Sequence, residues 1–186
     1  MKKLKWIILI IVALLALVFF VGMPYMKEQT KKISPETTKT YTENGMDLSI
    51  NYSGPFKKGR TIFGDLVPYD VVWRTGANEP TKFITATDIK IIDKILPAGT
   101  YSFWTIPNKD SWKVIFNSEI PDWGVTILSG GKKTTRNPKA DVIVFEVPVE
   151  KSTIVEQQLT MDFEEDDQLY LTLSWDLTKI RIPINQ

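Results

Sequence analysis

The stretch of sequence that decides the fold is Leu169-Tyr170-Leu171-Thr172-Leu173-Ser174-Trp175. Large apolar side chains occupy every second position, and side chains with a polar group lie between them. Successive side chains of a β-strand point to opposite faces of a sheet, so this period of two predicts a strand with one buried face. The same alternation occurs at residues 46–52, 159–163 and 180–184.

Further strands are predicted at residues 70–74, 81–86, 88–95, 100–106, 111–117 and 141–148, separated by Gly, Pro, Asn and Asp clusters. Residues 63–71 carry apolar side chains at helical spacing, but Gly64 and Pro68 interrupt them, so only a short turn is expected there. Many short strands without alternating helices predict an all-β fold. Of the two antiparallel architectures that fit, a sandwich or a barrel, we expect an antiparallel β-sandwich that is jelly-roll-like.

An uncharged apolar segment occupies residues 6–23. As a helix that rises ~1.5 Å per residue it would cover roughly 27 Å, close to the about 30 Å of a bilayer's hydrocarbon core. Trp6 and Tyr25 bracket the segment at the depths where aromatic rings collect in membranes. We therefore expect one retained N-terminal transmembrane helix. A cleaved signal peptide is the alternative, but no small-residue cleavage pattern follows the segment.

This division predicts a cytoplasmic tail at residues 1–5, a transmembrane anchor at 6–25, a polar linker at 26–40 and a β-sandwich domain at 41–186. The short N-terminal tail favours an N-terminus on the inside. The expected localisation is the cytoplasmic (inner) membrane, with the C-terminal domain on the periplasmic or extracellular side.

The composition excludes several classes of function. The chain has no cysteine and no histidine. Disulfides, thiol nucleophiles, imidazole bases and metal sites built from these residues are therefore impossible. Seven of the 23 basic and two of the 22 acidic side chains lie in residues 1–40, so the remainder is mildly acidic. A nucleic-acid partner would require a basic surface, and we expect none.

Several blocks between residues 52 and 124 carry a family resemblance. They read YSGP at 52–55, KGRTIFG at 58–64, LVPY at 66–69, VWRTGANE at 72–79, LPAGTYS at 96–102, WKVIFN at 112–117 and WG at 123–124. In this order they resemble family 2911 of the domains of unknown function, found in bacterial envelope proteins. The likeness covers residues 41–184 and ends in LSWD at 173–176. It implies export and an all-β fold, and it supplies no catalytic residues because the family has no established activity.

Residues 59–79 are the part of the sequence richest in groups that bind ligands. An Arg fork can hold a carboxylate or sulfate while a Trp ring stacks on a sugar. Three residues of this segment also have an explanation that involves no ligand. Arg74 would form an ion pair, Asn78 would shape a turn and Trp73 would belong to the core. The ligand-binding candidates are Arg60, Tyr69, Trp73, Arg74, Asn78, Glu79, Trp104 and Trp123.

The six tryptophans divide by their phase in the predicted strands. Trp112 and Trp175 are in phase with apolar neighbours and are expected in the core. Trp104 faces opposite to Phe103, and Trp123 lies in a Pro-Asp-Trp-Gly turn, so these two are the candidates for exposed platforms.

Two charged segments have simple interpretations. Residues 164–167 read EEDD, which lacks the spacing of a calcium-binding loop and predicts a solvated hairpin tip. Residues 129–139 are Gly- and Lys-rich but lack the spacing of a phosphate-binding loop, so a basic hairpin loop is expected. No metal and no cofactor are predicted.

The leading hypothesis is a membrane-anchored envelope domain that acts as a non-enzymatic binding module for a glycan, peptide or protein. The alternative is a carboxylate-dependent hydrolase or lyase acting on an envelope polysaccharide, with Glu79, Asp122 and Asp176 as candidate carboxylates. A structural subunit whose helix packs with other membrane proteins is a further possibility. The sequence alone leaves open whether the chain is an enzyme.

Overall fold

The computed structural model describes residues 2–126, 129 and 133–186. The chain consists of two compact units, Met1–Ile33 and Ser34–Gln186.

The first unit is helical. Helix α1 (Lys2–Leu17) continues through a π-helical turn, η1 (Val18–Gly22), into α2 (Met23–Ile33). The π turn precedes Pro24, which has no N–H to donate to the preceding turn, and the Met23 N–H donates to the Val18 carbonyl five residues back. Within the described residues, Lys3–Ile33 is the one helix long and apolar enough to span a membrane or to serve as a signal sequence.

The second unit is one antiparallel sheet of nine strands among the described residues, in the order β1-β2-β3-β6-β7-β8-β9-β4-β5. The strands are β1 (Glu36–Tyr41), β2 (Leu48–Ser53), β3 (Lys82–Thr85), β4 (Ile89–Ile91), β5 (Lys94–Leu96), β6 (Gly99–Ile106), β7 (Ser111–Asn117), β8 (Asp141–Glu165) and β9 (Leu169–Asn185). A short 3-10 helix, η3 (Pro138–Ala140), leads into β8.

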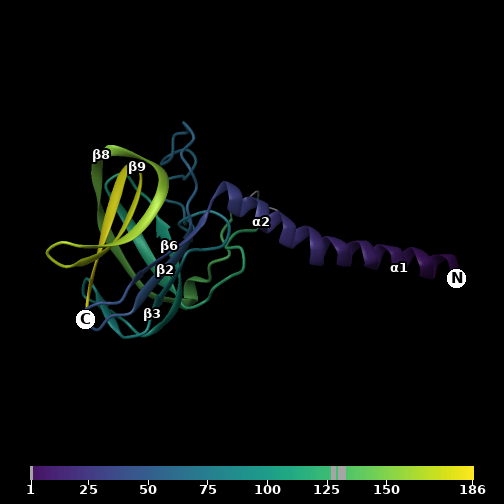
Figure 1. The fold of residues 1–186 in the computed structure, drawn as a ribbon, viewed down its shortest axis with the longest axis horizontal. Helices are drawn as coiled ribbons and strands as arrows, with labels where there is room; N and C mark the ends of the chain where they lie inside the picture. Colours follow the sequence, from purple (N-terminus) through teal and green to yellow (C-terminus); the bar gives the residue numbers. More distant parts are fainter. Residues whose placement is uncertain (1, 127–128, 130–132) are drawn as a thin grey trace. The chain divides into compact units, whose positions relative to one another are not determined.

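The length and bend of β8 convert this single sheet into two layers. Its first half pairs with β7, while its second half pairs with β9 through register shifts between Lys151 and Thr160. Figure 1 shows β8 and β9 in green and yellow as a long, strongly curved pair. The result is a sandwich-like, unclosed sheet, which confirms the predicted fold class.

The core lies between the two layers and follows the period of two. On β9 the alternate side chains Leu169, Leu171, Leu173 and Trp175 are at most 5% exposed. They pack with Leu48 and Ile50 of β2 and Phe83 of β3, which have no exposed surface. Trp112 and Trp175 are both in this core, as their phase in the sequence predicted.

Three local features differ from the sequence prediction. The predicted strand at residues 70–74 is wrong, because this segment lies in a loop in which Trp73 forms an isolated bridge with Thr105. Residues 88–95 form the hairpin of β4 and β5, which turns at Ile92 with a φ of 59°. The strand β1 was not predicted at all.

Two predicted loops lie at the edges of the fold. The acidic residues 164–167 fall at the tip of the β8–β9 hairpin, where a solvated tip was expected. The predicted basic loop at 129–139 lies partly outside the described residues, because 130–132 are not described.

The long connection between β2 and β3, residues 54–81, positions the candidate site and is called the 54–81 loop. Backbone hydrogen bonds hold it to the sheet, from Lys57 N to Gln157 O (2.6 Å) and from Trp73 N to Thr105 O (2.7 Å). Ile62 and Val67 anchor it in the core. Such a long ordered connection is uncommon in a compact domain and is characteristic of functional loops.

Candidate functional site

The candidate site is built on the face of β6 that points away from the main core. Phe103 of β6 lies in that core, while Trp104 points to the opposite face and is fully buried. The Trp104 Nε1–H donates to Ser102 Oγ at 2.8 Å, and Ser102 Oγ donates to the Glu119 carbonyl at 2.6 Å. Loops therefore cover this face of the sheet and create a second, smaller packed region.

Gly124 lies where the two covering loops meet over Trp104. A Cβ atom added at Gly124 would be 2.7 Å from Pro80 Cγ, 3.3 Å from the Trp104 ring and 3.4 Å from Arg74 Cδ. The backbone at Gly124 has a φ of 74°, a conformation that suits glycine. Only a residue without a side chain lets the segments that carry Arg74 and Trp123 approach so closely.

Arg74 is the charged group of this site. Its Nη1 donates to the Trp123 carbonyl at 2.8 Å, and its guanidinium carbon lies 5.8 Å from the centre of the Trp123 ring, within the range of a cation–π contact. The side chain is half-buried. Burial lowers the pKa of Arg74, and the negative charge of Glu79 opposes this shift. We refer to Arg74, Glu79, Trp104, Trp123 and Gly124 as the Arg74 site.

A hydrogen-bond network fixes the backbone on either side of Arg74. The Thr75 and Thr105 hydroxyls are 3.0 Å apart, and Thr81 Oγ1 donates to the Thr75 carbonyl at 2.6 Å. Asn78 Nδ2 donates to the Ser34 carbonyl at 3.2 Å. Thr75 and Asn78 adopt left-handed φ values of 55° and 59°. Asn adopts this conformation readily, but the β-branched Thr75 is strained in it, and such strain clusters at functional sites.

The other candidate residues make their contacts outside the Arg74 site. Arg60 is exposed and donates to the carbonyls of Phe56 (2.6 Å) and Lys57 (3.1 Å) in its own turn. Tyr69 lies against Gly64. Trp73 packs against the main core, with its ring stacked on Trp175 at 6.2 Å between centroids. Trp73 therefore packs as a residue at the edge of the core, which was the alternative to a ligand-binding role.

Trp104 and Trp123 take different positions within the Arg74 site, and Asn78 lies on the loop that carries Arg74. Trp104 is completely buried and so presents no exposed platform; it supports the other residues from beneath. Asn78 is 6% exposed, and its side chain bonds to the backbone of the distant Ser34. Trp123 is half-buried beside Arg74 and remains the candidate for contact with a ligand.

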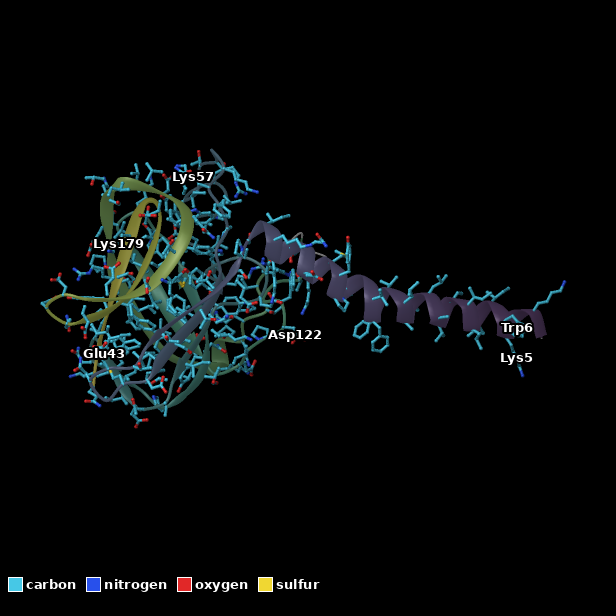
Figure 2. All side chains as sticks on the ribbon, in the orientation of Figure 1. Lys5, Trp6, Glu43, Lys57, Asp122 and Lys179 are labelled. Carbon is cyan, nitrogen blue, oxygen red and sulfur yellow. The ribbon has the colours of Figure 1, made fainter. Side chains whose placement is uncertain are left out.

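The three candidate carboxylates do not share one region. Asp176 forms an ion pair with Lys57, and the two side chains are 21% and 20% exposed. Asp122 precedes Trp123, and Figure 2 shows Lys57 and Asp122 in separate parts of the β domain. Glu79 acts on Arg74 through its charge. A glycosidase needs two carboxyl groups that flank one bond, and Asp122 and Asp176 do not provide this arrangement.

Pro80, Ser102 and Gly124 contribute to the site and were not predicted. The turn sequence PDWG at 121–124 places a glycine next to Trp123, and this is the sequence feature from which Gly124 could have been predicted. In the part of the chain that the structure describes, no group of three or more acidic side chains is placed to hold a metal ion. The chemistry that the Arg74 site offers is hydrogen bonding and charge pairing with an anion beside an aromatic ring.

Comparison with known proteins identifies a family. The family model described as Protein of unknown function (DUF2911) matches residues 34–184. These bounds coincide closely with the second compact unit, Ser34–Gln186. No curated protein and no solved structure matches the chain.

Proposed function

We propose a binding role for this chain, which belongs to the DUF2911 family of proteins of unknown function. In this proposal the helix Lys3–Ile33 is a retained anchor in the cytoplasmic membrane, and the β domain lies on the periplasmic or extracellular side. There it acts as a non-enzymatic module that binds an acidic group of an envelope glycan, peptide or protein at the Arg74 site.

The position of Arg74 is the observation that carries the proposal. A half-buried guanidinium is partly dehydrated, so an anion that reaches it gains more from charge pairing than at a fully exposed arginine. Its bond to the Trp123 carbonyl fixes the orientation of the planar group. A carboxylate can accept two parallel N–H bonds from such a group, while the Trp123 ring offers an apolar surface to the rest of the ligand.

Glu79 is expected to tune this affinity. Its charge already stabilises the protonated form of Arg74, so it also competes electrostatically with an incoming carboxylate. An acidic ligand therefore has to displace part of an existing interaction, which favours ligands with more than one contact. This balance suits reversible recognition of a repeated acidic polymer better than tight capture of a free anion.

The proposal is tested by retention of envelope fragments on the full chain in nanodiscs. Solubilised acidic glycan and peptide fragments should be retained by the native chain, and Arg74→Gln should lose about tenfold in affinity, as expected for a hydrogen bond to a charged group. Arg60→Gln is the matched control, because Arg60 is an exposed arginine of the same loop that bonds only to its own turn among the described residues.

Two results would count against the proposal. Equal losses in Arg74→Gln and Arg60→Gln would show a general effect of positive charge. Turnover of a polysaccharide without saturable binding would favour the hydrolase or lyase over a binding module.

A further inference from the structure

A pocket lies at the end of the sandwich where the β8–β9 hairpin tip, the β1–β2 turn and the last residues of β9 meet. Its volume is about 480 Å³. Ligand sites for small molecules have volumes of roughly 300 to 1,000 Å³, so the pocket has a suitable size. It shares no lining residue with the Arg74 site. We call it the hairpin-end pocket.

The floor of the hairpin-end pocket is apolar. Met46, Leu169 and Ile184 line it, and these side chains are only 7%, 5% and 1% exposed. They belong to the main core, which makes the floor a fixed surface. An apolar part of a ligand would lie against this floor.

The rim is polar and is organised around Glu165. The Tyr41 hydroxyl donates to Glu165 Oε1, and Asn44 Nδ2 donates both to Glu165 Oε1 (3.2 Å) and to the Tyr41 oxygen (2.9 Å). The hydrogen bond to Glu165 raises the pKa of Tyr41, so this phenol stays a neutral donor. Both groups that hold the Glu165 carboxylate are therefore uncharged, and they orient it without neutralising it.

The acidic side chains next to Glu165 differ in whether a cationic side chain pairs with them. Asp166 pairs with Arg181 at 3.1 Å, while Asp167 accepts a hydrogen bond from the neutral Tyr170 hydroxyl at 2.9 Å. The single lysine of β1, Lys39, pairs with Asp162, which lies outside the pocket. In the described part of the chain the pocket thus combines an apolar floor with a negative rim on which Glu165 and Asp167 lack a cationic partner.

We infer that the hairpin-end pocket binds an organic cation that joins an ammonium group to a short apolar body. The ammonium group pairs with Glu165, and the apolar body covers Met46 and Leu169. A bare metal ion fits less well, because no group of three acidic side chains is placed to hold one among the described residues. A neutral or anionic molecule of the same shape would leave Glu165 without its charge partner.

The test uses three small molecules of similar length, namely aminopentanol, pentanediol and hydroxypentanoate, which are a cation, a neutral molecule and an anion near neutral pH. The full chain in nanodiscs carries carbon-13-labelled methionine methyl groups as reporters. Met46 lines the pocket, and the fully buried Met161 of β8 is the internal control. Aminopentanol should shift the Met46 signal in a saturable manner and leave Met161 unchanged, whereas pentanediol should produce no comparable shift.

Two variants complete the test. Glu165→Gln keeps the hydrogen-bonding shape and should weaken aminopentanol binding about tenfold, the magnitude of a hydrogen bond to a charged group. Glu146→Gln, an exposed acidic residue on β8 outside the pocket, should not change it. An unchanged Met161 signal in both variants verifies the fold. Equal shifts with pentanediol, no shift of Met46, or full binding by Glu165→Gln would overturn the inference. The result does not depend on Arg74, which lies outside the hairpin-end pocket.

Discussion

At the residue scale, Gly124 decides whether the Arg74 site can close. An alanine at this position would place its Cβ 2.7 Å from Pro80 Cγ and would also require a φ of 74°. Gly124→Ala should therefore lower the free energy of unfolding by about 1 to 3 kcal/mol more than the backbone effect alone, and it should weaken ligand binding by displacing Arg74.

Gly59→Ala separates the steric effect of the added Cβ from the effect of the positive φ. Gly59 has nearly the same φ, 72°, but no atom within 4 Å of the added Cβ. Thermal unfolding of the full chain in detergent, followed by near-UV circular dichroism, should show a modest loss for Gly59→Ala and a larger one for Gly124→Ala. Equal losses would mean that packing at Gly124 is not tight.

Individual residues also show where sequence reasoning succeeded. The phase of Trp112 and Trp175 within their strands was sufficient to place both in the core. Phase also separated Trp104 from Phe103, but it could not reveal that loops bury the second face of β6. That burial depends on Gly124 and Pro80, which are distant from Trp104 in the sequence and become neighbours only in the fold.

At the element scale, the edge strand β1 is the clearest omission. Its sequence, ETTKTY, has no large apolar side chain at alternate positions, and none of its residues is fully buried. The strand forms because its backbone pairs with β2 from Glu36↔Ser53 to Tyr41↔Leu48. A pattern of apolar residues cannot detect a strand of this kind. Similarly, the continuous β8 contains both predicted strands 141–148 and 159–163, joined across a bend.

This strand gives a prediction about fragments. A fragment that starts at residue 34 keeps β1, whereas one that starts at residue 42 loses it together with the Lys39–Asp162 ion pair and the Tyr41–Glu165 hydrogen bond. The shorter fragment also exposes the edge of β2. We expect the longer fragment to unfold cooperatively and remain monomeric, and the shorter one to be less stable and to associate, as measured by thermal unfolding and sedimentation. Equal behaviour would show that β1 is dispensable.

At the scale of the whole molecule, the proposal depends on which side of the membrane carries the β domain. The chain has no cysteine, so a single introduced thiol reports its own position. In spheroplasts of a bacterial host, a membrane-impermeant maleimide should label Thr61→Cys, an exposed position of the 54–81 loop, without lysis. A cysteine added at the N-terminus should be labelled only after permeabilisation. The reverse pattern would place the β domain in the cytoplasm and exclude an envelope ligand.

Recognition of a carboxylate by Arg74 is tested by titrating retained envelope fragments before and after chemical amidation of their carboxyl groups. We expect amidation to weaken binding to the native chain about tenfold and to have little further effect on Arg74→Gln, because both changes remove the same interaction. Glu79→Gln should bind the unmodified fragment more tightly than the native chain. Amidation that weakens binding equally in the native chain and in Arg74→Gln would contradict the claim.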